Sequence, residues 1–332
     1  MVTKQTLRQV TFTASLTTWI AIACAIAVHS AHSQQPADQP AERKILLTAI
    51  DRDQRPVLSL QTADLRVTEQ GVAQSIVALS FLKDRPFSVL ILIDISISQE
   101  RSLPLQKRAA TAFVNSAIKD GRDQIGVVTF TGTARLEQSL TNDLPLLRAA
   151  IERAEVVFPA GYTGGGVVVG PPSPASKAAA IAGSTAIWDA VITAADYLGG
   201  RANGGTRRAI ILLTDGIDTT SKSSSSQAID RANREDVAVY SIGVGDDKSF
   251  GLEKDPLKKL SERTGGRAFF PKTPTELPQI FDHIQYELRN QYELRYRAAA
   301  TRSKRVKIDV VNPALKDIKL SYQQSAPVDG QP

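Results

Sequence analysis

The run from Val89 to Ser98, VLILIDISIS, constrains the fold of this chain more than any other stretch. Its first five residues are aliphatic without alternation, a pattern typical of a strand buried on both faces of a parallel sheet that helices cover. The run ends in Asp94, and Ser96 and Ser98 follow at alternate positions. Ligands of such sheets bind at the carboxyl ends of the strands, so the same run marks a candidate binding crevice.

Oxygen-bearing side chains without nitrogen or sulfur partners suit a hard cation such as Mg²⁺. Taken alone, Asp94, Ser96 and Ser98 favour the simpler interpretation of a polar loop after a strand. Two further segments favour the cation, because Asp215 follows another apolar run, RAIILLT, and Thr185 lies in GSTAIWDA, in the first turn of a predicted helix. We therefore expect these five residues to converge at one edge of the sheet.

Strand and helix patterns alternate through the middle of the chain, in a part that we predict as one α/β domain, residues 87–271. The predicted strands are 87–93, 124–130, 208–214, 237–244 and 267–270. The predicted helices begin near Pro104 and cover 140–154, 184–198, 226–235 and 256–263. This alternation predicts a doubly wound, mainly parallel sheet with helices on both faces. A segment rich in Gly and Pro, residues 158–182, interrupts the pattern.

The two flanks of this domain have β patterns of their own. Residues 44–84 contain three short alternating or apolar runs with Gln70-Gly71 as a turn, which predicts an N-terminal β unit. Residues 277–322 begin with a helical pattern and continue with about three alternating runs, which are typical of antiparallel strands with one wet face. We expect the two flanks to form a small β-rich unit, and residues 323–332 to be a polar tail.

The first 33 residues are typical of a secretory signal. Lys4 and Arg8 precede an apolar stretch, and Ala31-His32-Ser33 provides small residues for cleavage. A polar linker, residues 34–43, follows. We expect an exported protein of the periplasm, the cell envelope or the medium, without a transmembrane span once the signal is removed. An uncleaved membrane anchor and a lipid anchor at Cys24 are the alternatives.

Removal of this segment would restrict the available chemistry. It would lower the formal net charge from +6 to +4 and leave no cysteine and one histidine, His283. Disulfides and His/Cys zinc sites would then be excluded, and Ser-His-Asp catalysis would depend on His283, which lies in a helical pattern. The balance of 40 Lys and Arg against 34 Asp and Glu is too even to indicate a nucleic-acid partner.

The five site residues carry a family resemblance. Asp94-x-Ser96-x-Ser98, Thr185 and Asp215, in this order and on these elements, resemble the metal-ion-dependent adhesion site (MIDAS) of the von Willebrand factor A (VWA) domain. The resemblance implies that Ser96, Ser98 and Thr185 contact Mg²⁺ (or Mn²⁺ or Ca²⁺), and that Asp94 and Asp215 act directly or through water. Over about residues 44–322, the chain also resembles a bacterial subfamily of exported VWFA-related proteins of the acidobacterial type.

Two positions depart from the family pattern. The family usually has Gly between the two serines and Met after the second, where this sequence has Ile97 and Gln99. A β-branched residue is a poor choice where φ must be positive, so we expect a reshaped loop at Ile97. A degenerate, metal-free domain is the corresponding alternative.

The function expected from these features is a non-enzymatic binding module. A cation held by hydroxyls stays electrophilic, so an Asp or Glu of a protein partner would complete its coordination. One alternative is a structural or assembly scaffold that uses the β flanks for contact. Another is a metal-dependent hydrolase, disfavoured because no obvious general base accompanies the two carboxylates. The sequence does not indicate the partner's identity or an oligomeric state.

Overall fold

The computed structural model describes residues 42–118, 121–158, 184–201, 206–244, 251–298 and 305–324, all within one compact unit, residues 40–332. The predicted signal segment, most of the predicted linker, nearly all of the Gly- and Pro-rich segment and most of the polar tail lie outside the described residues.

The described residues form two sheets of six strands each. The first sheet has the order β6-β5-β4-β7-β8-β9, in which β6 is antiparallel to β5 and the other pairs are parallel. Its strands are β4 (Phe87–Asp94), β5 (Gln124–Phe130), β6 (Ala134–Thr141), β7 (Arg207–Thr214), β8 (Val237–Gly243) and β9 (Ala268–Phe269).

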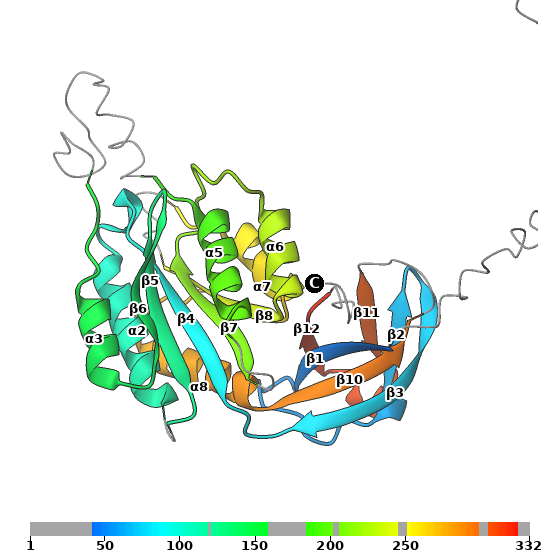
Figure 1. The fold of residues 1–332 in the computed structure, drawn as a ribbon. Coiled ribbons are helices and arrows are strands. Elements are labelled where there is room, and N and C mark those ends of the chain that lie inside the picture. The colour runs from blue at the N-terminus through cyan, green and yellow to red at the C-terminus, as the bar shows by residue number, and fades with distance from the viewer. Residues whose placement is uncertain are drawn as a thin grey trace, which may run out of the picture. The chain divides into compact units, whose positions relative to one another are not determined.

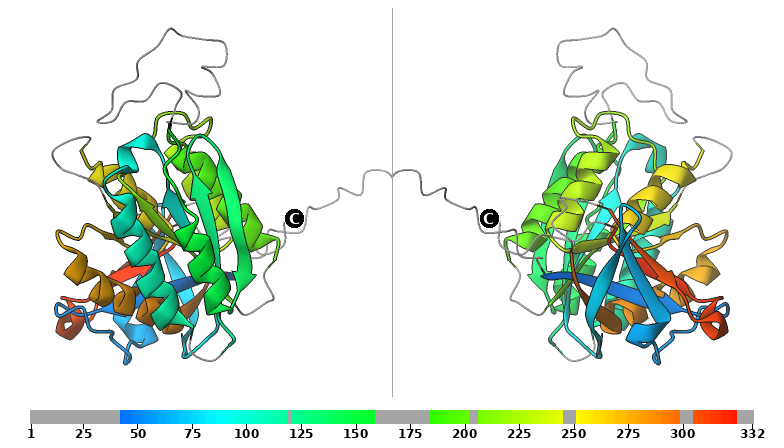
Figure 2. Two further views of the ribbon diagram at one scale, coloured as in Figure 1. Left: turned by 90° about the vertical axis from the view of Figure 1, so that its left-hand side faces the viewer. Right: turned by 90° about the vertical axis from the view of Figure 1, so that its right-hand side faces the viewer.

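Helices cover both faces of this sheet (Figures 1 and 2), which explains the unbroken apolar run of β4. Val89, Ile91 and Ile93 point into a core shared with α2 (Leu103–Ala117), α3 (Leu144–Glu152) and α8 (Leu277–Arg289). Leu90 and Leu92 point into the opposite core, shared with α5 (Ile187–Gly199), α6 (Ser225–Arg234) and α7 (Lys254–Arg263). The predicted doubly wound α/β fold is confirmed.

Two predicted elements are corrected. The helix expected over 140–154 is shorter, because residues 134–141 form the antiparallel strand β6 and α3 begins at Leu144. The Asp143 carboxylate caps α3 by accepting a hydrogen bond from the Leu146 N–H at 3.1 Å. Thr185 was expected in the first turn of a helix, but α5 begins at Ile187 and Thr185 lies in the irregular segment before it.

The second sheet is antiparallel and interleaves the two flanks of the chain, as the predicted β-rich unit requires. Its order is β11-β2-β3-β10-β1-β12. The strands are β1 (Glu42–Ile50), β2 (Leu65–Glu69), β3 (Val72–Leu82), β10 (Gln291–Arg297), β11 (Val306–Val310) and β12 (Lys319–Tyr322). Strand β1 pairs with β10 on one side and with β12 on the other, so an N-terminal strand lies between two C-terminal ones.

The two outer strands of the second sheet approach each other. The Val306 N–H donates to the Gln324 carbonyl at 2.8 Å, and the Ile308 N–H donates to the Tyr322 hydroxyl at 2.9 Å. The curled sheet encloses its own core, which includes Leu47, Val67, Leu294 and Tyr296. This core is separate from the two cores of the parallel sheet.

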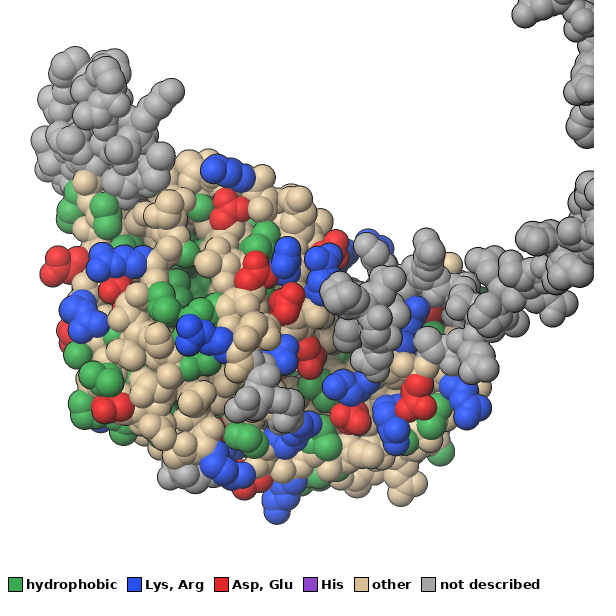
Figure 3. Space-filling view, viewed as in Figure 1, with side chains coloured by type: hydrophobic (Ala, Val, Ile, Leu, Met, Phe, Trp, Pro, Cys, Tyr) green, Lys and Arg blue, Asp and Glu red, His purple; other side chains and the backbone are tan. Residues whose placement is uncertain are grey.

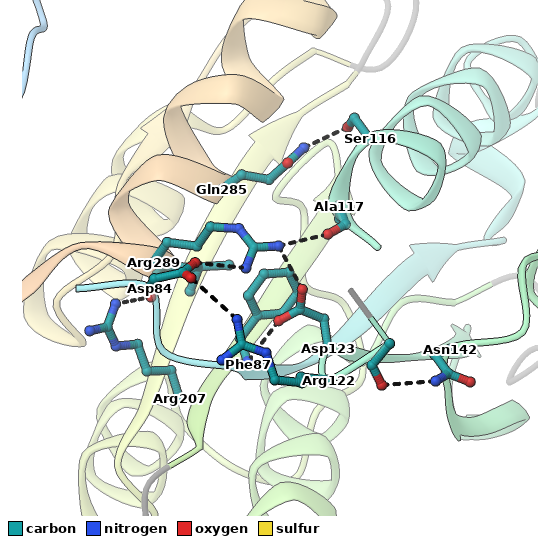
Figure 4. A network of polar contacts seen from close by, with 12 residues as sticks. Asp84, Phe87, Ser116, Ala117, Arg122, Asp123, Asn142, Arg207, Gln285 and Arg289 are labelled. Atoms are coloured by element: carbon teal, nitrogen blue, oxygen red, sulfur yellow. Dashed lines mark hydrogen bonds and ion pairs between the residues drawn. The ribbon is translucent and has the colours of Figure 1, made fainter. Parts of the chain in front are cut away.

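A polar network fixes α8 at the amino end of β4 (Figure 4). The buried Asp123 carboxylate accepts hydrogen bonds from the Phe87 N–H at 3.1 Å and from the Arg289 guanidinium at 2.6 Å. Arg289 also donates to the Ala117 carbonyl at 2.9 Å and lies 4.9 Å from the centre of the Phe87 ring. The network therefore ties α2, β4 and α8 together.

Basic and acidic side chains are interspersed on the face of the molecule drawn in Figure 3. On the second sheet, Arg295 pairs with Glu42 at 3.0 Å and Lys307 with Asp309 at 2.8 Å. Among the helices of the described residues, none is long and apolar enough to cross a membrane.

Candidate metal centre

Asp94 is the last residue of β4 and is completely buried. One carboxylate oxygen accepts a hydrogen bond from the Ser96 N–H at 3.0 Å, and the other accepts one from the Thr214 hydroxyl at 2.6 Å. Thr214 ends the neighbouring strand β7. Parallel pairing of β4 and β7 thus brings a carboxylate and a hydroxyl from positions 120 residues apart to one edge of the sheet.

Ser96 and Ser98 lie in the turn that follows β4. Residues Ile97–Gln99 form a short 3₁₀ helix, η2. The hydroxyl oxygens of Ser96 and Ser98 are 3.1 Å apart. The described non-glycine residues with positive φ are Gln54, Gln70, Asp84 and Asp236. Ile97 is therefore accommodated with an ordinary negative φ, so the loop does not demand glycine at this position.

Asp215 follows β7 directly and is 1% exposed. One of its carboxylate oxygens accepts a hydrogen bond from the Ile217 N–H at 3.0 Å. The other accepts one from the Gln99 side-chain amide at 2.7 Å, and the same amide nitrogen is 3.2 Å from the Ser98 hydroxyl. Gln99, which departs from the family pattern, thus joins the two strand ends.

Burial perturbs both carboxyl groups, and at Asp94 the charge of its neighbour adds to the effect. Burial first, and then the negative charge of Asp215, raise the pKa of Asp94 to about 7, against hydrogen bonds from Ser96 and Thr214 that lower it. Burial also raises the pKa of Asp215, against hydrogen bonds from Ser98, Ile217 and Gln99. Two carboxyl groups buried side by side, one of them disfavoured by the charge of the other, form a site whose electrostatic cost a bound cation would relieve.

Thr185 is held at the same edge through its backbone and is 4% exposed. Its N–H donates to the Thr219 hydroxyl at 2.8 Å, and its carbonyl accepts from the N–H groups of Thr219 and Thr220. The next residue, Ala186, donates to the carbonyl of Thr131, which follows β5. Thr185 is therefore placed between the ends of β5 and β7. The hydrogen bonds of the described residues join the other four predicted ligands, and they do not reach the Thr185 side chain.

The donor set is that of a hard cation. Within the described residues, no group of three or more His, Cys, Asp and Glu side chains is placed to hold a metal ion. A cation at this edge would therefore depend on the carboxylates of Asp94 and Asp215 together with hydroxyl oxygens, the combination that Mg²⁺ prefers over softer metals.

An open cavity of about 470 Å³ lies beside the end of β4. Ile95, the residue after Asp94, lines it together with Thr129 and Thr131 at the end of β5. Its charged lining residues are Arg135, Glu137, Arg153 and Glu155. The cavity thus offers both signs of charge to a partner that reaches the same edge.

Family models identify the parallel-sheet domain. Two models, both described as von Willebrand factor type A domain, match residues 89–217 and 176–283. The matches overlap and together span residues 89–283, which contain all five predicted site residues. A search of curated proteins found no significant match.

Solved structures with low sequence identity are similar in fold. An aerotolerance-related membrane protein from Bacteroides fragilis is 19% identical, with 61% of this chain and 98% of that chain covered and a TM-score of 0.44. A von Willebrand factor type A protein from Catenulispora acidiphila is 12% identical (89% and 75% covered, TM-score 0.46). Proximal thread matrix protein 1 from the mussel byssus, with a zinc-occupied MIDAS motif, is 16% identical (63% and 49% covered, TM-score 0.43). All three TM-scores lie below 0.5, so the family models carry the assignment.

Proposed function

Because the chain contains a von Willebrand factor type A domain over residues 89–283, we propose that it is an exported, non-enzymatic module that binds a protein partner through a divalent cation, with Mg²⁺ as the preferred ion. Ser96, Ser98 and Thr185 would supply hydroxyl ligands, and Asp94 and Asp215 would act directly or through water. The bound cation supplies a positive charge with an open position, which a partner's Asp or Glu fills.

One observation carries this proposal. Asp94 and Asp215 are buried at the ends of two adjacent parallel strands, close enough for the charge of one to raise the pKa of the other. Burying two carboxylates together is unfavourable unless a proton or a cation compensates their charge. The hydroxyls of Ser96 and Ser98, 3.1 Å apart in the adjoining turn, are neutral ligands that leave the cation electrophilic.

A metal-free scaffold is the second candidate, and a specific observation favours it. Hydrogen-bond donors already reach all four carboxylate oxygens, from Ser96, Thr214, Ile217 and Gln99. With one carboxyl protonated, this arrangement is satisfied without a cation. If the protein is a scaffold, its partner would contact the second sheet, which is formed by strands of both flanks.

Calorimetric titration with Mg²⁺ and Mn²⁺ separates the two candidates. We expect the wild-type protein to bind one Mg²⁺, and Asp94→Ala to lower the affinity by at least about a hundredfold, because a carboxylate of the site is lost. Asp255→Ala is the matched control, since Asp255 is an acid of the same domain whose side chain is 96% exposed. A wild-type protein that gives no heat with either ion would exclude the cation mechanism.

Partner capture tests the second step. A partner recovered from native envelope extract in Mg²⁺ should elute with EDTA, and Asp94→Ala should fail to recover it. Capture that is equal in Mg²⁺ and EDTA, and unchanged by Asp94→Ala, would favour the scaffold.

A further inference from the structure

Gln99 is a completely buried side chain whose amide lies against the predicted cation ligands. Its nitrogen donates to the Asp215 carboxylate at 2.7 Å and to the Ser98 hydroxyl at 3.2 Å. Its oxygen points the other way, where it accepts hydrogen bonds from the Ser102 hydroxyl and from the Gln106 amide, the latter at 2.7 Å. The amide is thus held in one plane from both sides.

The oxygen of Gln106 is the unsatisfied member of this network. It is buried, and no hydrogen-bond donor among the described residues reaches it. Buried amide oxygens are normally paired, so an orphan of this kind requires an explanation. An amide that turns by half a revolution exchanges its oxygen and nitrogen in nearly the same space. If Gln99 and Gln106 both turned, the Gln99 nitrogen would donate to the Gln106 oxygen and to the Ser102 hydroxyl, which can also accept.

The turned arrangement places an amide oxygen beside Ser98 and Asp215. Two acceptors at 2.7 Å repel each other unless a positive charge lies between them. Octahedral Mg²⁺ with ligands at about 2.0–2.1 Å separates neighbouring ligand oxygens by about 2.9 Å. The three spacings here are 2.7 Å (Gln99 to Asp215), 3.2 Å (Gln99 to Ser98) and 3.1 Å (Ser96 to Ser98), so the same positions suit hydrogen bonds without the ion and ligand edges with it.

We propose that Gln99 supplies its side-chain oxygen as a further ligand of the divalent cation, and that Gln106 turns with it to keep the amide pair hydrogen-bonded. The inference rests on the proposed cation site. Without the ion, the Gln99 amide N–H donates a hydrogen bond to the Asp215 carboxylate and so partly compensates its negative charge. With the ion, the amide turns and the Gln106 oxygen gains its donor, while the Gln106 nitrogen takes the position at which that oxygen had no partner.

Two substitutions distinguish an oxygen ligand from a mere donor. Gln99→Met removes both the oxygen and the N–H groups, whereas Gln99→Glu keeps an oxygen in place and removes the N–H groups. By calorimetry we expect Gln99→Met to weaken Mg²⁺ binding about tenfold. We expect Gln99→Glu to bind within about threefold of the wild type or more tightly. Circular dichroism in EDTA checks that both variants fold.

Each other pattern of affinities overturns the inference. If Gln99 only orients Asp215 by donating to it, both variants weaken binding. If its amide merely competes with the ion, Gln99→Met binds as tightly as the wild type or more tightly. A wild-type protein that binds no Mg²⁺ removes the proposed function as well. If the wild-type protein binds Mg²⁺ but the variants follow one of the two patterns just described, the proposed function stands and only the role of Gln99 is excluded.

A measurement on the wild-type sequence does not depend on how the variants fold. In protein labelled with ¹⁵N-glutamine, Mg²⁺ should shift the side-chain amide signals of Gln99 and Gln106 together, and the signal missing from Gln99→Met identifies the first. Asp94→Ala protein treated in the same way is the control and should show no shift. Binding of Mg²⁺ by the wild type with both amide signals unmoved would contradict the turn.

Discussion

Glu287 on α8 shows how a single buried carboxyl makes stability depend on pH. Its side chain is almost fully buried, and one oxygen accepts a hydrogen bond from the Arg267 guanidinium at 2.8 Å. The other oxygen has no hydrogen-bond partner among the described residues. Burial raises the pKa of Glu287 above its usual 4.5, although the nearby Arg267 lowers it. The ionised form is therefore less favourable in the folded protein than in the unfolded chain.

The sign of the pH effect follows from proton binding. Between pH 4.5 and the raised pKa, the folded protein binds more protons at Glu287 than the unfolded chain does, so this group's contribution to the free energy of unfolding is lost as pH rises. The slope reaches at most about 1.4 kcal/mol per pH unit. We expect Glu287→Gln to flatten the pH profile measured by urea unfolding in EDTA. Glu152→Gln, at a largely exposed position, is the control, and equal slopes for Glu287→Gln and wild type would refute the effect.

At the candidate metal centre, the sequence could predict which residues lie at the strand ends, but not which side chains they contact. Asp94, Ser96, Ser98 and Asp215 are readable because each follows a buried apolar run, and parallel strands that end together bring their last residues to one edge. Their role as ligands stays a prediction. Gln99 was not predicted because its contact is with Asp215, 116 residues away, and nothing in its local pattern indicates that contact. Thr185 was placed in a helix because its segment reads as helical, whereas Thr219 binds its N–H group.

Among the elements, α3 and β6 show where a local pattern is ambiguous. β6 is an edge strand whose residues are half-buried or exposed, so apolar and polar residues alternate only weakly along it. The apolar residues that follow it have helical spacing, and the local pattern therefore predicts a helix that begins too early. The helix boundary is decided by Asp143, whose carboxylate accepts from the Leu146 N–H, and by Pro145 in the first turn. Strand β4, by contrast, is buried at every position and was predicted to within one residue.

The cap of α3 can be tested directly. Asp143→Ala removes the acceptor for a helix N–H group, so we expect the free energy of unfolding to fall by about 1 kcal/mol. Asp143→Asn keeps a capping oxygen and should lose only a small part of that. The comparison is made by urea unfolding of the three proteins. Equal losses for both variants would show that the charge of Asp143, and not its cap, stabilises the helix.

At the scale of the whole molecule, the sequence predicted that both flanks contribute to one β unit, and this is confirmed. The strand order could not be predicted, because alternating apolar residues show which face of a strand is buried but not which strand lies beside it. The helical pattern of α8 directly precedes the C-terminal strands, and on the sequence alone we assign it to their unit. Its apolar residues pack in the core of the parallel sheet, where Leu277, Phe281, Ile284 and Leu288 meet α2 and β4.

The network around Asp123 should be critical for holding these parts together. Asp123→Ala removes the buried carboxylate 2.6 Å from the largely buried Arg289 guanidinium and leaves it the exposed Asp84 at 3.8 Å, so we expect a loss of about 3 kcal/mol in the free energy of unfolding. Adding Arg289→Met removes the uncompensated charge, so the double variant should lose clearly less than the sum of the two single losses. Urea unfolding of the four proteins measures this coupling, and additive losses would count against it.

The interleaved second sheet has a consequence for how the chain reaches its folded state. Leu47 pairs with Tyr292 and with Tyr322, partners that lie 245 and 275 positions further along the chain. During synthesis, β1 is made long before β10 and β12. Until they are made, its backbone N–H and C=O groups have no strand to pair with, and its apolar face is uncovered. Contacts so distant in sequence form slowly and expose strand edges to aggregation. We therefore expect the second sheet to close late in folding, and β1 to be most exposed to aggregation before it closes.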